Sequence, residues 1–197
     1  MAIEADHLKH LSPIQALILL LLDSENAQPV KGRTWLQKEM FLILSNAGKE
    51  IEEEAQFEPH HFGPYSEVVE SELANLKLLG LVDENKEIRI TKAGKKIAAE
   101  LRKYVSPKFL EFISQVKREL NDLTEDELLA YIYFTFPEMT SESKALERIL
   151  KKRKWLALSL YRKGKVSLSK ASQIAGVSVS EFSKFLRSKN IGVSLGW

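Results

Sequence analysis

Five polar side chains close to the C-terminus could bind the edges of nucleic-acid bases. Residues 178–187 have the pattern of an amphipathic helix, with apolar residues on one face and Ser, Lys and Arg on the other. Hydroxyl groups can bond base edges or phosphates, and Lys or Arg can bond guanine or phosphate oxygens. The predicted base-reading residues are Ser178, Ser180, Ser183, Lys184 and Arg187.

Basic side chains in the same part of the chain could hold phosphate groups. The last 47 residues contain 11 Lys and Arg and a single acid, Glu181, whereas the first 150 contain 18 bases and 26 acids. Such a sign asymmetry between parts of one chain indicates a polyanion as the partner of the basic part. The predicted phosphate-binding residues are Lys151, Lys152, Arg153, Lys154, Lys163, Lys165 and Lys170.

A helix-turn-helix would position these residues. The small residues Ala171 and Ala175 allow two helices to cross closely, and Gly176 supplies a turn conformation that other residues resist. In such a motif the second helix enters the major groove of DNA, so its polar face would carry the base-reading residues. The alternative is a plain helical hairpin with solvated polar side chains, but a hairpin alone does not require the surrounding positive charge.

The last seven residues, 191–197, alternate between apolar and small residues and predict a β-strand. A lone strand at a chain end is unstable unless it packs on its own domain or pairs with another chain. Pairing across a two-fold axis would place two recognition helices on a palindromic site. We therefore expect a homodimer.

Residues 1–136 are predicted to form an acidic winged helix body with two extra helices. Helical patterns near residues 13–24, 34–47 and 66–79 precede a hairpin pattern, in which residues 81–82 and 88–90 flank a turn, and a helix over 91–104. The extra helices lie near residues 107–120 and 125–136, and the second begins with the capping-box pair Thr124 and Glu127. Because this body is acidic, contact with DNA and contact with protein both stay open as its role.

The polar, helix-breaking segment 137–143 is predicted to be a linker, and residues 144–197 a basic helix-turn-helix domain with a terminal strand. The expected fold class is thus mostly α: a winged helix (helices plus a β-hairpin) followed by a C-terminal helix-turn-helix domain.

The sequence favours a binding protein over an enzyme. It has no cysteine, no phosphate-binding glycine loop and no Ser/His/Asp arrangement, so we expect no catalytic residues and no cofactor. The adjacent His60 and His61 would point to opposite sides of an extended segment without a third ligand, so no metal site is expected. The longest apolar run, residues 16–22, is too short to span a bilayer, which predicts a cytoplasmic protein without a membrane partner.

The C-terminal part resembles a known family. Residues 160–167, with the motif that continues to Leu186, are similar to small prokaryotic helix-turn-helix proteins often regarded as antitoxins of PIN-domain ribonuclease toxins. The resemblance covers about the last 45 residues, and Ser172 stands where the family has a second small residue after Ala171. It implies an antitoxin-like DNA-binding protein with a PIN-domain toxin as a candidate partner.

The N-terminal part resembles winged helix domains found beside antitoxin and regulator modules. The similarity spans residues 13–104 and includes the motifs at 35–38, 62–66, 79–81 and 90–94. It implies a fold, but no functional residues can be carried over from it.

Together these observations predict sequence-specific binding of double-stranded DNA by a transcriptional regulator or antitoxin-like autorepressor. One alternative is a protein-interaction module that neutralises a toxin or acts as an adaptor, with DNA binding secondary. Another is RNA binding by the basic part, although we expect no exposed aromatic side chains there on which bases could stack.

Overall fold

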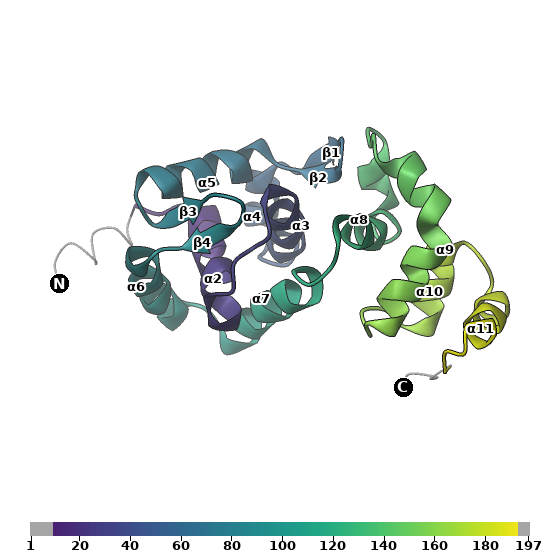
Figure 1. Ribbon diagram of the computed structural model, residues 1–197. Coiled ribbons are helices and arrows are strands. Elements are labelled where there is room, and N and C mark those ends of the chain that lie inside the picture. Colours follow the sequence, from purple (N-terminus) through teal and green to yellow (C-terminus); the bar gives the residue numbers. More distant parts are fainter. Residues whose placement is uncertain (1–9, 193–197) are drawn as a thin grey trace. The chain divides into compact units, whose positions relative to one another are not determined.

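The computed structural model describes residues 10–192, and the chain forms two compact units (Figure 1). The N-terminal unit consists of the residues up to Glu58 together with Pro64–Asp122, and the C-terminal unit consists of Pro59–Gly63 and the residues from Leu123 onward. Two short strands, β1 (Glu58–His60) and β2 (Gly63–Tyr65), form a two-stranded sheet where the chain passes between the units. No helix within residues 10–192 is long and apolar enough to cross a membrane.

The N-terminal unit is built around a buried helix, α2 (Pro13–Ala27). Ser12 caps α2 through a capping box with Gln15, and Pro13 occupies the first helical position, as its sequence predicts. Apolar residues lie on all sides of α2, which suits a helix covered on several faces. It packs against α5 (Glu67–Leu78), α6 (Lys92–Leu101), α7 (Pro107–Leu120) and strand β4 (Ile88–Ile90).

The order of elements in this unit is compatible with the predicted winged helix. Helices α2, α3 (Arg33–Leu44) and α5 precede an antiparallel hairpin of β3 (Val82–Glu84) and β4, in which Val82 pairs with Ile90. An isolated bridge between Val30 and Ile88 adds a third strand position before α3, where winged helices place one. A short helix that the sequence analysis missed, α4 (Lys49–Ala55), lies between α3 and α5, and the 3-10 turn η1 (Arg102–Tyr104) follows α6.

A buried lysine fixes the end of α2. Regular helix geometry stops before Ser24, and Glu25 and Asn26 adopt left-handed conformations. The Lys117 ammonium, on α7, donates hydrogen bonds to the carbonyl oxygens of Leu21, Leu22 and Ser24 at 2.9, 3.1 and 3.0 Å. Since the last carbonyl groups of a helix have no partner within it, Lys117 satisfies the end of α2 from a neighbouring helix.

The C-terminal unit is a chain of packed helices: α8 (Glu125–Tyr133), α9 (Leu146–Arg162), α10 (Leu168–Ala175) and α11 (Val179–Ser188). Each packs against the next in this order, and the 3-10 turn η2 (Pro137–Thr140) connects α8 with α9 (Figure 1). Its core is formed by apolar residues from all four helices, among them Leu128, Ile132, Leu156, Leu160, Ile174, Phe182 and Leu186.

The division between the units lies after Asp122 and not at the predicted linker, residues 137–143. Those residues form η2 and a tight turn inside the C-terminal unit, where the Ser143 hydroxyl donates to the Tyr133 hydroxyl at 2.6 Å and the Lys144 N–H to the His61 carbonyl. Polar, helix-breaking composition therefore marks a turn within a domain here. From residue 123 onward the chain holds 13 Lys and Arg against 7 Asp and Glu, so the C-terminal unit stays basic after α8 is assigned to it.

The predicted terminal strand, 191–197, lies mostly outside the described residues. Its first two members, Ile191 and Gly192, form no strand. The N–H of Ile191 instead donates to the carbonyl of Leu186 at 3.0 Å and closes the last turn of α11.

Candidate nucleic-acid interface

A tight turn joins α10 and α11 in the manner of a helix-turn-helix. Gly176 adopts a left-handed conformation with φ 71°, and its N–H donates to the carbonyl of Gln173 at 3.1 Å. The next N–H, of Val177, donates to the carbonyl of Ser172 at 3.2 Å. This pair of bonds is a Schellman motif, which glycine favours because it has no β-carbon. Ser178 then caps α11, so only three residues separate the two helices.

Packing beneath the turn fixes the orientation of α11. Ala171 and Ile174 of α10 and Phe182 and Leu186 of α11 are fully buried, as the amphipathic pattern predicts. The Phe182 ring also contacts Tyr161 of α9 edge-on, with ring centroids 6.4 Å apart. The opposite face of α11 is consequently directed toward solvent.

Four of the predicted base-reading residues lie on that outward face. Ser180, Lys184 and Arg187 are exposed and Ser183 is half-buried. Within residues 10–192, neither Lys184 nor Arg187 forms an ion pair with a carboxylate, so both cations remain available to a ligand. The helix thus presents two hydroxyl groups and two cations across one face.

The fifth predicted base reader, Ser178, has a structural role. Its hydroxyl donates to Glu181 Oε2 at 2.7 Å and accepts from the Glu181 N–H, while its own N–H donates to the same carboxylate. These bonds form a capping box and lower the pKa of Glu181. Because the hydroxyl proton is already used, Ser178 is better described as the N-terminal cap of α11.

The basic run Lys151–Lys154 does not form one patch. Successive helical residues point about 100° apart, so the run encircles α9. Lys151 pairs with Glu147 at 2.6 Å and Lys152 with Asp126 at 2.8 Å. Both lysine side chains are more than half exposed, and such surface pairs contribute about 0–1 kcal/mol, so a phosphate could replace either carboxylate.

Two predicted phosphate-binding residues cap helices instead. Arg153 donates from Nε to the carbonyl of Ile174 at 2.7 Å and from Nη2 to that of Gln173 at 3.1 Å, at the end of α10. The Lys170 ammonium donates to the carbonyl of Phe134 at 2.9 Å, at the end of α8. Partial burial lowers the pKa of both side chains. Cations at helix C-termini satisfy free carbonyl groups and interact favourably with the negative end of the helix dipole. These interactions account for both residues without a phosphate.

The guanidinium of Arg153 also occupies the space beside Gly176. A β-carbon at position 176 would lie 2.5 Å from the guanidinium carbon of Arg153. The same guanidinium lies 4.5 Å from the centroid of the Phe134 ring in a cation–π contact. Arg153 therefore connects α8, α9 and the turn.

Lys163 is likewise committed to the fold. Its ammonium pairs at 2.8 Å with the carboxylate of Glu127, which is only 5% exposed and also accepts from the Ser159 hydroxyl. Burial alone would raise the pKa of Glu127, but hydrogen bonds from Lys163, Ser159 and Thr124 outweigh it and lower the pKa to about 2. This cluster ties the start of α8 to the end of α9.

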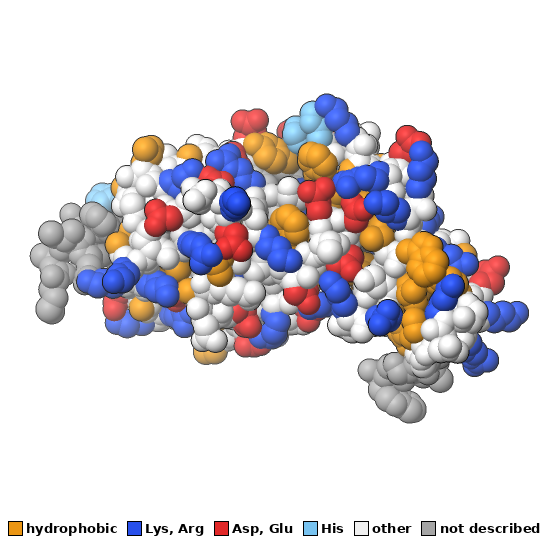
Figure 2. Space-filling view, in the orientation of Figure 1, with side chains coloured by type: hydrophobic (Ala, Val, Ile, Leu, Met, Phe, Trp, Pro, Cys, Tyr) orange, Lys and Arg blue, Asp and Glu red, His pale blue; other side chains and the backbone are white. Residues whose placement is uncertain are grey.

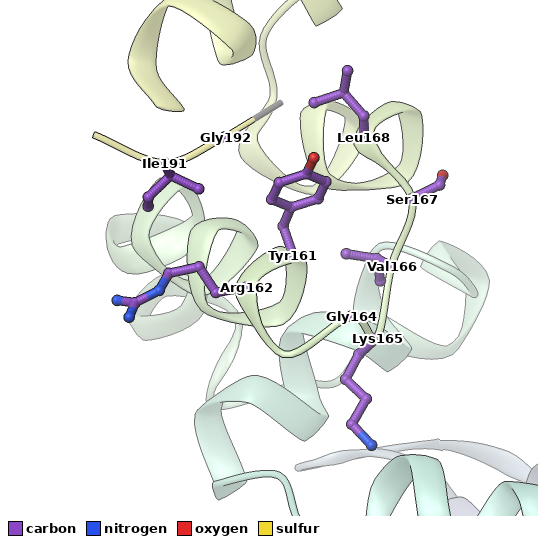
Figure 3. Close-up of a pocket in the computed structure, with 9 residues that line it drawn as sticks. All are labelled: Tyr161, Arg162, Gly164, Lys165, Val166, Ser167, Leu168, Ile191 and Gly192. Carbon is purple, nitrogen blue, oxygen red and sulfur yellow. The ribbon is translucent and has the colours of Figure 1, made fainter. Parts of the chain in front are cut away.

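Lys165 lies beside an open groove of about 520 Å³ next to the start of α10. Figure 3 shows the Tyr161 ring projecting toward Leu168 and Gly192, whereas the Lys165 side chain extends away from that ring. Lys165 thus lines the groove while its side chain extends away from the Tyr161 ring, and the residue is only half exposed.

An aromatic surface beside α11 was missed at the sequence level. Trp155 of α9 is 57% exposed and contacts the Phe185 ring edge-on, with centroids 5.5 Å apart. Lys154 lies 4.4 Å from the Phe185 centroid, and Lys189 lies 5.0 Å from that of Trp155. Figure 2 shows apolar side chains beside Lys and Arg on the C-terminal unit. We call these four residues the aromatic-lysine patch; its exposed tryptophan contradicts our expectation that the basic part lacks exposed aromatic residues.

Within the described part of the chain, no three His, Cys, Asp or Glu side chains are grouped so that they could hold a metal ion.

Comparison with known proteins gives one match. Residues 131–196 match the profile of an uncharacterised protein family, UPF0175. The match begins within α8, which agrees with a C-terminal unit that starts before η2. No curated protein and no solved structure matched the chain.

Proposed function

We propose that the protein binds double-stranded DNA sequence-specifically, as a transcriptional regulator or antitoxin-like autorepressor, and that α11 is its recognition helix. The observation that carries this proposal is the outward face of α11, where exposed Lys184 and Arg187 stand beside Ser180 on a helix that a glycine turn and a buried apolar face hold in place. A helix of this kind fits the major groove, in which Lys and Arg recognise guanine.

Phosphate contacts would come from exposed cations of α9 and of the residues at the end of α11. Lys154 and Lys189 flank its apolar side through the aromatic-lysine patch, and Lys151 and Lys152 are exposed on α9. Arg153, Lys163 and Lys170 are left out of this set because each already satisfies groups within the unit.

The N-terminal unit is proposed to contact protein, not DNA. In winged helices the helix before the hairpin enters the groove, and here that helix, α5, carries Glu67, Glu70 and Glu72. Arg33 pairs with Glu70 and with Glu84 of the hairpin, and Lys77 also pairs with Glu84 at 2.5 Å, so both cations are already neutralised. Three carboxylates on the groove-facing helix would oppose the approach of phosphates.

A homodimer fits this division of roles. One helix-turn-helix reads only a few base pairs, so a single copy discriminates weakly against a genome of competing sites. We propose that two copies bind a palindromic site, with a contact between N-terminal units or between the C-terminal segments.

The test is selection of duplexes from a random library by the full chain, followed by affinity measurements at several salt concentrations. Arg187→Ala and Lys184→Ala should each weaken binding to the selected duplex by about 1–3 kcal/mol and affect a random duplex less. The matched control is Lys49→Ala, which removes the same charge from an 87% exposed side chain of the N-terminal unit. Failure to enrich any duplex, or equal losses for all three variants on both duplexes, would rule out the proposal.

The second candidate is a protein-interaction module, an adaptor or the antitoxin of a PIN-domain ribonuclease, and the aromatic-lysine patch favours it. Tryptophan is enriched among residues that dominate protein interfaces, and Trp155 is the most exposed large apolar side chain of the described C-terminal unit. If a PIN-domain ribonuclease is encoded beside the gene, Trp155→Ala should restore its RNA cleavage in a mixture where the unaltered protein suppresses it. Unchanged suppression would remove the patch from that role.

A further inference from the structure

Val179 is an exposed apolar side chain at the start of α11. It is the first residue of α11, directly after the cap Ser178, and it is 44% exposed although it lies on the helix that carries the buried Phe182 and Leu186. Valine is a weaker helix former than alanine, so local helix stability does not require it there. A ligand that covered it would gain the free energy of removing this apolar surface from water.

The neighbours of Val179 limit what that ligand can be. The Ser178 hydroxyl and the Glu181 carboxylate are bonded to each other at 2.7 Å, so the polar groups of the first turn are largely used. Ser180, the next residue, is exposed. The start of α11 therefore offers one branched apolar group next to one hydroxyl group.

We propose that Val179 recognises the 5-methyl group of a thymine in the major groove. This inference rests on the proposed function, because it takes α11 as the recognition helix. The N-terminal residues of a recognition helix are those that reach base edges. Among the major-groove edges of the four base pairs, only the thymine methyl group is apolar, and apolar side chains recognise it by direct contact. Val179 is thus a specificity-determining residue that adds a thymine to the bases read by Lys184 and Arg187.

The experiment removes the methyl group without changing the pairing. The duplex is the one enriched by the full-length protein from a random library, and each thymine is replaced in turn by deoxyuridine. Affinity is measured by fluorescence anisotropy for the unaltered protein, for Val179→Ala and for Leu150→Ala. Leu150, on α9, is 41% exposed and serves as the matched apolar control. Both substitutions are at exposed positions and put alanine, a strong helix former, in a helix, so the folds should persist.

For the unaltered protein and for Leu150→Ala, one thymine per half-site should be sensitive, and its replacement should weaken binding about three- to fivefold, the effect of burying one methyl group. Val179→Ala should bind the thymine duplex more weakly by a similar factor and should not distinguish thymine from uracil at that position, while other positions keep their response. Full thymine–uracil discrimination by Val179→Ala, or none by the unaltered protein on a duplex it binds specifically, would overturn this inference alone. If no duplex is enriched, the proposed function and the inference both fail.

Discussion

Replacing Glu127 by glutamine should destabilise the C-terminal unit in a pH-dependent way. The buried Glu127 carboxylate pairs with Lys163 at 2.8 Å and accepts a second bond from Ser159. Its pKa falls from an ordinary value of 4.5 to about 2. A shift of this size corresponds to about 3 kcal/mol, since each unit of pKa represents about 1.4 kcal/mol. Glutamine keeps the shape and one acceptor but loses the charge opposite Lys163, so we expect a loss of about 2–3 kcal/mol at pH 7.

The sign of the pH dependence follows from the lowered pKa. A carboxylate whose pKa is lower in the folded state contributes its full stability above its unfolded pKa, near 4.5, and loses it as the pH falls toward 2. The difference in unfolding free energy between the unaltered protein and Glu127→Gln should therefore be largest near pH 7. It should shrink below about pH 4.5.

Hydrogen exchange of the α8 and α9 amides, followed by mass spectrometry from pH 4 to pH 7, reports the opening free energy of this unit apart from the rest of the chain. The matched control is Glu125→Gln, from the same turn of α8. The Glu125 side chain is 44% exposed and pairs with Arg148 at 3.0 Å. The free energy of unfolding that this variant loses should therefore stay within about 0.5 kcal/mol. A loss below about 1 kcal/mol for Glu127→Gln at pH 7, or a difference that does not change with pH, would refute this reasoning.

Two further substitutions test other parts of the structure. Arg153→Gln should lower the stability of the C-terminal unit by about 2 kcal/mol, because it removes a charged cap from the end of α10. The discrimination between selected and random duplexes should stay unchanged. A selective loss of affinity for the selected duplex in a folded variant would return Arg153 to the DNA-binding residues. Lys117→Met should cost about 3 kcal/mol and lower Tm by roughly 6–12 °C, since three carbonyl groups of α2 and the buried Glu39 lose a buried cation. The control Lys108→Met, at an exposed position of α7, should change Tm little. Equal shifts of Tm for the two variants, in thermal melts followed by circular dichroism, would contradict the role of Lys117 at the end of α2.

The helix-turn-helix could be predicted from the sequence because its signals are local. Gly176 permits the left-handed turn, and the buried Phe182 and Leu186 follow from a spacing of four residues. The same local reasoning found the Thr124–Glu127 capping box of α8. It overlooked the corresponding box of Ser178 and Glu181, because a serine at the start of a predicted recognition helix also suits a DNA contact.

The roles of the cations could not be predicted in this way. Lys163 meets Glu127 across 36 residues, and Arg153 meets the end of α10 across about 20, so the sequence shows the charges but not their neighbours. Charge counting assigned these residues to phosphates, whereas packing assigns them to helix ends and a buried carboxylate. The exposed Trp155 was missed for a related reason, since an aromatic residue within an amphipathic helix is usually part of a core.

The position of the domain boundary leads to a last prediction, which concerns fragments. A fragment of residues 144–197 contains α9, α10 and α11 and was expected from the charge pattern to be the DNA-binding part. The structure adds α8, which packs on α9, buries Leu128 and Ile132, and supplies Glu127 to Lys163.

Without α8, the face of α9 that packs against it would be exposed, and Lys163 and Lys170 would lose their partners Glu127 and the Phe134 carbonyl. A small domain has little stability to spare, so this loss should prevent cooperative folding. We expect a fragment of residues 123–197 to unfold cooperatively in a thermal melt followed by circular dichroism and to keep the preference for the selected duplex. The fragment of residues 144–197 should melt without a defined transition and bind duplexes only weakly, through its charge. Equal melting behaviour and equal duplex preference for the two fragments would show that α8 is dispensable, because the helix-turn-helix would then be stable on α9 alone.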